Sequence, residues 1–156
     1  MSKPYRQGPV GALVDEYERA VGELVRVLDS ISDEQYVLLR DAATEDEDCR
    51  SIQTIVRHVI GSGHGYAGML RDAWGIPRGL SAPGGVARSE AGPKLREMLA
   101  YTSETLSGRW EISAGDMIAM RMPARWGPVY DLEQLFEHAI VHVLRHRRQI
   151  ERFLDR

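Results

Sequence analysis

Apolar residues recur with helical spacing along four long segments of the chain, and no segment shows the strict alternation that is typical of a strand. In the first segment, Val10, Val14 and Tyr17 follow the i, i+4, i+7 pattern of one helical face. The predicted helices span residues 10–31, 51–74, 93–110 and 131–154. The connections 75–92 and 111–130 are long enough to cross an end of a bundle. The pattern predicts an all-α fold, a four-helix bundle with long crossover loops.

Local signals mark several helix boundaries. Ser32 with Gln35 resembles a capping box that opens a short extra turn, and Asp131 with Gln134 opens the last helix in the same way. The acidic run 44–48 is typical of a solvated loop. Four glycines within the second helix, at positions 61, 63, 65 and 68, indicate close helix contact or a local distortion.

Composition limits the class of protein. A chain of 156 residues suits one domain, so residues 1–156 are expected to form a single unit. The net charge of −3 gives no support for a nucleic-acid or membrane partner, and no apolar run approaches the roughly 18 residues of a membrane span. The N-terminus lacks the apolar segment of a signal peptide, and Cys49 is the single cysteine. These features favour a cytoplasmic protein.

Three of the five histidines stand four residues apart on the last predicted helix, so at least two of their side chains share one face. Helical phase places His146 at the flank of the core stripe, His142 at its edge and His138 further toward solvent. On the second helix, His58 lies at the margin of the core side and His64 is rotated away. His58, His142 and His146 can therefore face one another inside the bundle.

Two interpretations of this trio remain open. A lone histidine on an apolar face is usually a core residue that hydrogen-bonds to a carbonyl group. Three imidazoles buried together are costly without partners, whereas one divalent metal ion satisfies all of them. The H-E-x-x-H pattern of zinc peptidases is absent, which argues against that chemistry.

Two stretches resemble the DinB/YfiT-like superfamily of four-helix proteins. Residues 51–60 contain a helix-opening Ser51 followed by His58, and residues 142–150 match an H-x-x-x-H-R-x-Q-I signature. The order of the helices and the chain length are also similar. Arg148 departs from the family pattern, in which a small residue is common at this place, and could alter substrate access or dimer packing.

The resemblance implies that His58, His142 and His146 coordinate a divalent metal, commonly zinc or nickel. Members of the family look like thiol S-transferases or isomerases that use a low-molecular-weight thiol such as bacillithiol or mycothiol, or like metal-dependent hydrolases. Many have no demonstrated activity. The resemblance also implies a homodimer.

The first functional hypothesis is a metal-dependent enzyme that acts on a small electrophilic substrate, with thiol transfer ahead of hydrolysis. The loops 74–89 and 117–130 would shape the substrate pocket, and Arg125, Trp126 and Tyr130 are candidate substrate contacts, for each of which ordinary loop packing is the alternative. No catalytic residue is assigned, and Cys49 is interpreted as an inert thiol.

The second hypothesis is a stress-associated metal-binding or dimerisation module without turnover. The basic cluster 145–152 does not indicate nucleic acid, because stacking aromatics and a clear positive excess are missing.

Overall fold

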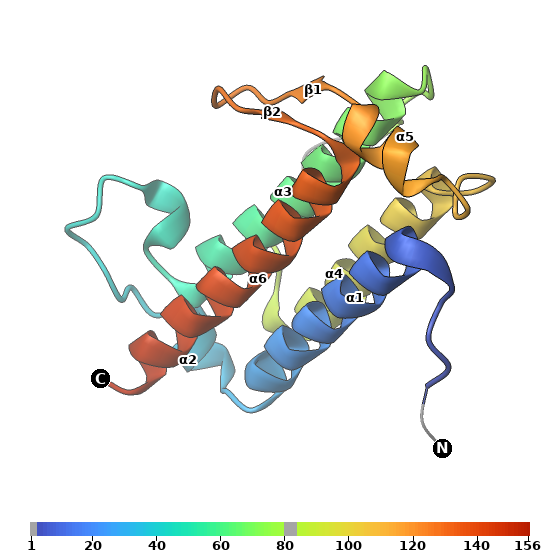
Figure 1. The fold of residues 1–156 in the computed structure, drawn as a ribbon. Coiled ribbons are helices and arrows are strands. Elements are labelled where there is room, and N and C mark those ends of the chain that lie inside the picture. Colours follow the sequence, from blue (N-terminus) through green and yellow to red (C-terminus); the bar gives the residue numbers. More distant parts are fainter. Residues whose placement is uncertain (1–2, 80–83) are drawn as a thin grey trace.

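The computed structural model describes residues 3–79 and 84–156, in which four long helices pack side by side (Figure 1). The long helices are α1 (Gly8–Asp29), α3 (Ile52–Ala73), α4 (Arg88–Thr105) and α6 (Leu132–Leu154). The short elements are α2 (Asp33–Val37), the 3₁₀ turn η1 (Glu47–Cys49), α5 (Ala114–Ala119), β1 (Met122–Pro123) and β2 (Val129–Tyr130). The predicted all-α four-helix bundle is confirmed.

The helices pair as α1 with α6 and α3 with α4, and α3 also packs against α6. Helices α3 and α4 run in the same direction, so the segment that joins them must return along the bundle (Figure 1). Its start is held near the far end of α4, where the Tyr101 hydroxyl donates to the Arg78 carbonyl at 2.6 Å. Its end is held near the start of α3, where the Gln53 amide donates to the Val86 carbonyl at 3.1 Å. This is a long crossover of the predicted kind.

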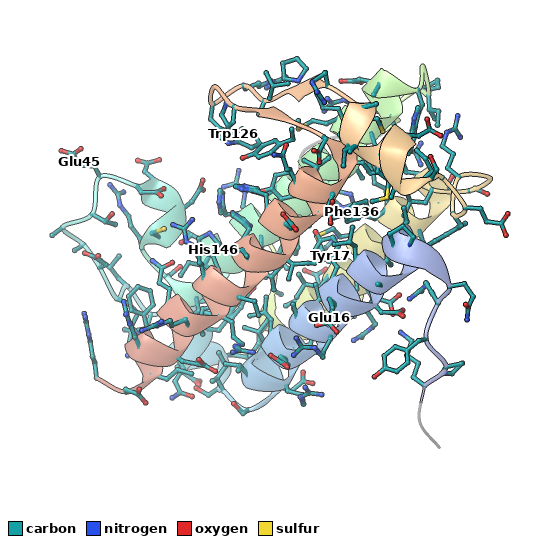
Figure 2. All side chains as sticks on the ribbon, viewed as in Figure 1. Glu16, Tyr17, Glu45, Trp126, Phe136 and His146 are labelled. Atoms are coloured by element: carbon teal, nitrogen blue, oxygen red, sulfur yellow. The ribbon has the colours of Figure 1, made fainter. Side chains whose placement is uncertain are left out.

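The core fills the space between the apolar stripes of the four helices. Tyr17 of α1 meets Phe136 of α6 edge to face, with ring centroids 6.5 Å apart, and the labels in Figure 2 show both near the contact between those helices. The side chains that are buried on α6 repeat with helical spacing: Leu132, Leu135, Phe136, Ala139, Val143, Ile150 and Phe153. His142 and His146 lie at the edge of this stripe, on the side that faces α3.

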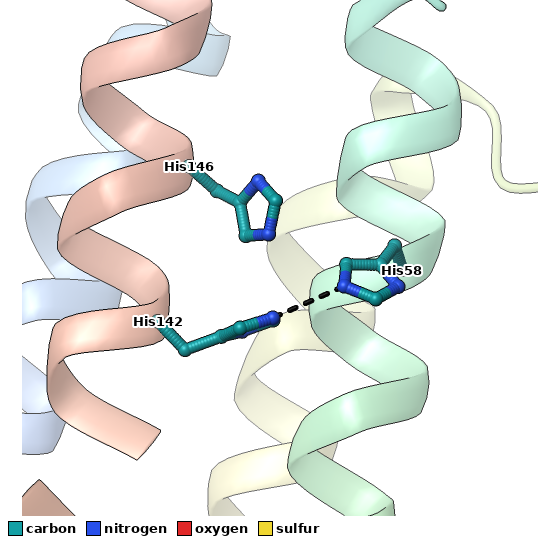
Figure 3. Close-up of side chains that lie close together, drawn as sticks. All are labelled: His58, His142 and His146. Atoms are coloured by element: carbon teal, nitrogen blue, oxygen red, sulfur yellow. Dashed lines mark hydrogen bonds between the residues drawn. The ribbon is translucent and has the colours of Figure 1, made fainter. Parts of the chain in front are cut away.

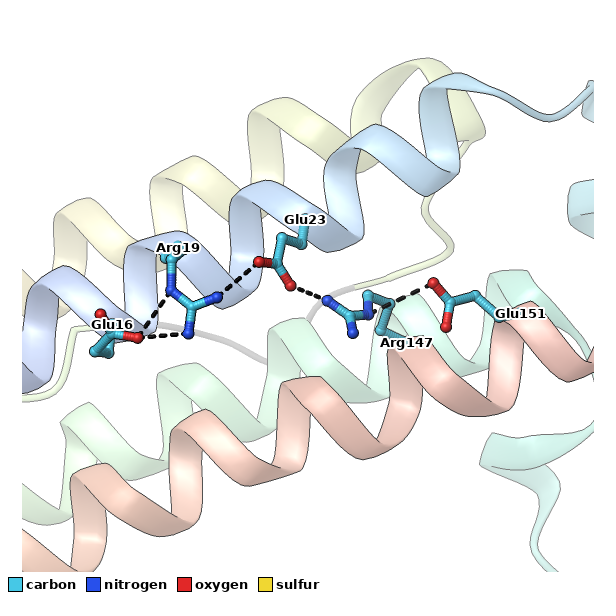
Figure 4. Close-up of polar contacts among 5 residues, drawn as sticks. All are labelled: Glu16, Arg19, Glu23, Arg147 and Glu151. Carbon is cyan, nitrogen blue, oxygen red and sulfur yellow. Dashed lines mark hydrogen bonds and ion pairs between the residues drawn. The ribbon is translucent and has the colours of Figure 1, made fainter. Parts of the chain in front are cut away.

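Ion pairs join α1 and α6 along one edge of the core (Figure 4). Arg147 contacts Glu23 of α1 and lies 3.6 Å from Glu151 of its own helix, and Arg19 reaches Glu16 at 2.5 Å and Glu23 at 2.7 Å. Partly exposed pairs of this kind contribute only about 0.2–1 kcal/mol each. Their main consequence is positional, because they commit Arg147 to the α1 side of α6.

The glycines of α3 reflect close packing at one position. A Cβ atom on Gly63 would lie 2.0 Å from the sulfur of Met98 on α4 and 2.9 Å from the Tyr17 hydroxyl. Helix α3 continues without a break from Ile52 to Ala73, so of the two predicted explanations, close contact holds at this glycine.

The predicted boundaries of the third helix are wrong. Helix α4 runs from Arg88 to Thr105, whereas residues 93–110 were expected. The Glu90 carboxylate accepts a hydrogen bond from the Ala87 amide at 3.0 Å, and Ala91 is buried. This cap and this burial stabilise a start before Pro93, which then costs one backbone hydrogen bond inside the helix.

The expectation that the chain contains no strand is also wrong. Strands β1 and β2 pair antiparallel across one end of the bundle, with Met122 opposite Tyr130. Gly127 has a φ of 117°, and the Ala124 amide donates to the Pro128 carbonyl at 2.8 Å, which closes the hairpin. Each strand has only two residues, too few for an alternating pattern to be visible in the sequence.

Candidate metal centre

Three histidines from two helices converge between α3 and α6 (Figure 3). His58 comes from α3, and His142 and His146 come from successive turns of α6. Each offers a ring nitrogen, and these nitrogens all lie within 4.8 Å of one another. The Nε2 atoms of His58 and His142 are 3.1 Å apart. Within the described ranges, these are the only three His, Cys, Asp or Glu residues that form such a group.

Acceptors hold the outer nitrogens of two of these rings. The Asp48 carboxylate lies 3.1 Å from Nδ1 of His58, and the Gln149 side-chain oxygen lies 3.0 Å from Nδ1 of His146. Because carboxylate and amide oxygens accept hydrogen bonds, each Nδ1 carries the proton in the neutral ring. The Nε2 lone pairs of His58 and His146 are therefore free for another ligand, as is usual for histidines that bind metals.

Burial keeps His142 and His146 neutral. It is the main cause that lowers the pKa of His142 to about 3, with smaller contributions from the neighbouring imidazoles of His146 and His58. Burial also lowers the pKa of His146. Both rings are therefore neutral at neutral pH, the state in which imidazole binds a metal.

The arrangement fits a divalent transition metal. Zinc–nitrogen bonds of about 2.0–2.1 Å at tetrahedral angles place two ligand nitrogens about 3.3–3.4 Å apart. The separation of 3.1 Å between the Nε2 atoms of His58 and His142 is close to that value. Without a metal, the same contact is a hydrogen bond in which Nε2 of His142 donates to Nε2 of His58. That bond leaves Nε2 of His146 without a partner among the three rings, whereas a metal ion would bind a nitrogen of each ring.

His138 is less enclosed than His142 and His146, as its helical phase predicts, but the hairpin covers part of it. His138 is half-buried, stacks on Trp126 at a centroid distance of 5.7 Å, and has Nδ1 3.3 Å from the Tyr130 hydroxyl. Helical phase relates a residue to the bundle core and takes no account of the hairpin that covers this part of α6. Burial lowers the pKa of His138, so this ring too is neutral.

His64 lies apart from the cluster, as its phase indicated. Its ring packs edge to face on Tyr101 of α4 at a centroid distance of 5.3 Å, and its Nδ1 is buried without a hydrogen-bond partner. The structure thus separates His64 from the three histidines that meet.

A cleft of about 780 Å³ opens on the hairpin side of the histidines. His58 and His142 form part of its wall, and Tyr66, Met69 and Met122 give it an apolar surface. Figure 2 shows Trp126 below the hairpin at this cleft.

The three candidate substrate contacts occupy different places. Arg125 and Trp126 line the cleft. Tyr130 lies behind this wall, with its hydroxyl 3.4 Å from the indole nitrogen of Trp126 and next to His138. The predicted pocket loop 74–89 contributes Arg78 to the lining, and its residues 80–83 lie outside the described ranges.

Cys49 lies near the other side of the histidines. Its sulfur is 3.3 Å from the Asp46 carboxylate and 3.8 Å from the Gln149 side-chain oxygen. Burial raises the pKa of the Cys49 thiol. The thiol is therefore mainly protonated at neutral pH, in agreement with the interpretation that it takes no part in the chemistry of the site.

The sequence did not reveal the two residues that orient the site. Asp48 belongs to the acidic run that was assigned to a solvated loop, and nothing in its spacing from His58 indicates contact. Gln149 stands three residues after His146 on the same helix, so its i, i+3 spacing was a usable signal.

Comparisons of the sequence with protein-family models and with curated proteins give no match. In the part of the chain that the structure describes, no helix has the length and hydropathy of a membrane span. The chemistry of the three histidines and of the spaces beside them is therefore the basis for a functional proposal.

Proposed function

We propose that His58, His142 and His146 hold a divalent transition metal, zinc or nickel, and that the protein is a metal-dependent enzyme of the DinB/YfiT-like type. The observation that carries this proposal is the convergence of three ring nitrogens, two of them on rings whose outer nitrogens are held by Asp48 and Gln149. The sequence resemblance supports the same three ligands.

The proposed reaction is attack of a small thiol on an electrophilic substrate, with hydrolysis as the related alternative. The thiol sulfur forms a bond to the electrophilic carbon, the leaving group departs with the bonding electron pair, and the thiol proton passes to solvent. A divalent ion held by the three histidines would keep one coordination position open. It would supply Lewis acidity for the attack of a thiol or a water.

The residues of the cleft have binding roles in this proposal. The rings of Tyr66 and Trp126 lie 6.1 Å apart and offer apolar faces to an uncharged substrate beside His142. Tyr130 and His138 support Trp126 from behind by stacking and hydrogen bonding. Arg125 is one of four charged side chains in the cleft lining, with Asp72, Arg78 and Arg121.

Metal analysis of protein purified without a histidine tag tests the site. We expect about one metal ion per chain in the wild type, and its loss in His58→Ala and in His142→Ala. His64→Ala is the matched control, because His64 lies apart from the cluster, and it should retain the metal. Metal content that neither ligand substitution lowers would refute the proposed centre.

A thiol-dependent conjugation assay then tests the activity. Turnover of halogenated or epoxide substrates that requires both metal and thiol supports the transferase, and turnover with metal and water alone supports the hydrolase. A metal-loaded protein that turns over neither class of substrate would favour a stress-associated metal-binding or dimerisation module.

Domain organisation, cellular location and oligomeric state are part of the same proposal. We propose that residues 1–156 form one domain that acts as a cytoplasmic homodimer on a small molecule. Light scattering after size-exclusion chromatography measures the mass in solution, and the 17.6 kDa of a single chain would contradict the dimer.

A further inference from the structure

A second cavity, of about 720 Å³, lies on the side of the histidines opposite the hairpin. It opens between α6 and the loop that carries η1, and Figure 2 shows His146 on the side of α6 nearer that loop, which is marked by Glu45. His58 and His142 border both this cavity and the cleft. The proposed metal centre therefore stands between two spaces.

Three arginines of α6 line this cavity, Arg145, Arg148 and Arg152. Their i, i+3, i+7 spacing places them along one face of the helix. In the described ranges none of them has an ion-pair or hydrogen-bond partner. The one carboxylate in the lining, that of Asp46, accepts from the Asp48 amide and from the Cys49 thiol. The lining thus carries an excess of positive charge.

Two other arginines have carboxylate partners, unlike these three. Arg147, on the neighbouring face of α6, contacts Glu23 and Glu151. Arg78, in the lining of the cleft, pairs with Asp72 at 3.0 and 2.5 Å. Exposed arginines on a helix are ordinarily just solvated. Here three exposed guanidinium groups, none with an ion-pair partner in the described ranges, line one cavity together with the histidines.

We propose that this cavity, which we call the arginine cavity, binds an oxyanion group, carboxylate or phosphate, of the molecule that reacts at the histidine site. The arginine fork matches the oxygens of both groups, and each such contact is a charge-assisted hydrogen bond. The cleft on the opposite side, whose wall includes Tyr66, Met69 and Met122, receives the other reactant. That this molecule reacts at the histidines rests on the proposed function, whereas the binding of an oxyanion rests on the arginines alone.

The position of Cys49 allows a direct test. Cys49 is the only cysteine of the chain and lines the arginine cavity, so an oxyanion bound there should slow its modification. Chelator-treated, metal-free protein is reacted with N-ethylmaleimide, which is uncharged, and followed by mass spectrometry. Inorganic phosphate and succinate are titrated in separate arms, and sodium chloride at equal ionic strength is the reference.

We expect saturable protection of Cys49 by one or both oxyanions. Protection by phosphate alone assigns a phosphoryl group to the ligand, and protection by succinate alone assigns a carboxylate. The double substitution Arg145→Gln and Arg148→Gln should raise the protecting concentration about tenfold or more, because two charge-assisted hydrogen bonds to the oxyanion are lost. Arg26→Gln removes one positive charge from an exposed site on α1 and should have no effect.

Protection no greater than that by chloride would overturn the proposal, as would equal protection in the double variant. Circular dichroism establishes that both variants are folded. Because the protein is metal-free in every arm, loss of the proposed metal centre would leave this result unchanged, and the two proposals fail separately.

Discussion

Substitution of Asp48 by asparagine tests whether the loop before α3 prepares the metal site. The Asp48 carboxylate lies 3.1 Å from Nδ1 of His58 and holds the proton on that nitrogen, which turns the Nε2 lone pair toward His142. Asparagine keeps the shape of the side chain and removes its charge. The amide oxygen is a weaker acceptor, so His58 becomes a weaker and less well-oriented ligand.

The size of the effect follows from the exposure of the pair. Loss of such an orienting partner typically weakens metal binding about 10- to 100-fold. The side chains of His58 and Asp48 are 31% and 47% exposed, so water screens the interaction and can partly replace the carboxylate. We therefore expect the affinity for zinc to fall about tenfold in Asp48→Asn, at the low end of this range, which corresponds to about 1.4 kcal/mol of binding free energy. Competition for zinc with a chelating dye measures the affinity.

Asp46→Asn is the matched control. Asp46 belongs to the same loop and carries the same charge, and its carboxylate accepts from the Asp48 amide at 3.0 Å as the cap of η1. Asparagine caps as well as aspartate, so the turn should be retained. Wild-type affinity in Asp48→Asn would refute the orienting role of Asp48. An equal fall in both variants would attribute the effect to the charge of the loop.

Three further predictions concern packing, pH and the cleft. Gly63→Ala should destabilise the protein by about 1–3 kcal/mol because its methyl group overlaps Met98, whereas Gly65→Ala, with open space at its Cβ, should be neutral or slightly stabilising; urea unfolding compares the two. The hydrogen bond from Arg6 is the main cause that lowers the pKa of Glu18. The stabilisation of the protein by this bond is therefore complete above the unfolded-state pKa of Glu18 and is lost as the pH falls through its folded-state pKa. Glu18→Gln should therefore lower the free energy of unfolding by about 0.5–1 kcal/mol at neutral pH and leave it unchanged in acid. Thermal unfolding at both pH values measures this, and an equal loss at the two pH values would contradict it. Trp126→Ala should raise the KM for an apolar electrophile and leave the metal content unchanged; a loss of metal would place Trp126 in support of the histidines instead.

The fold could be predicted where one helix face is continuously apolar. In α1, burial of Val10, Val14 and Tyr17 follows the periodicity visible in the sequence. The start of α4 could not be predicted in this way, because a cap at Ala87 and a buried alanine outweigh the local effect of Pro93. Propensity acts on one residue at a time, while burial depends on which neighbours the bundle brings to it.

The site was predictable to the extent that it depends on helix geometry. The spacing of His142 and His146 placed them on one face before any tertiary contact was known. Asp48 was hidden because its partner lies on another element, and acidic runs are usually solvated. The partial cover of His138 was hidden for the same reason, since a hairpin more than a turn away in sequence supplies it.

Helix α6 explains how a small bundle can hold polar chemistry without losing its core. One stripe of the helix, including Val143 and Ile150, is buried, and Arg147 on the adjoining face ties it to α1. The remaining face carries His142 and His146, whose burial is costly unless their nitrogens are bound. Because the apolar stripe and the ion pairs already anchor the helix, this third face contributes little to holding the bundle together. Substitutions at the two histidines should therefore change metal binding far more than stability, and a large loss of stability in metal-free His142→Ala would contradict this division of roles along α6.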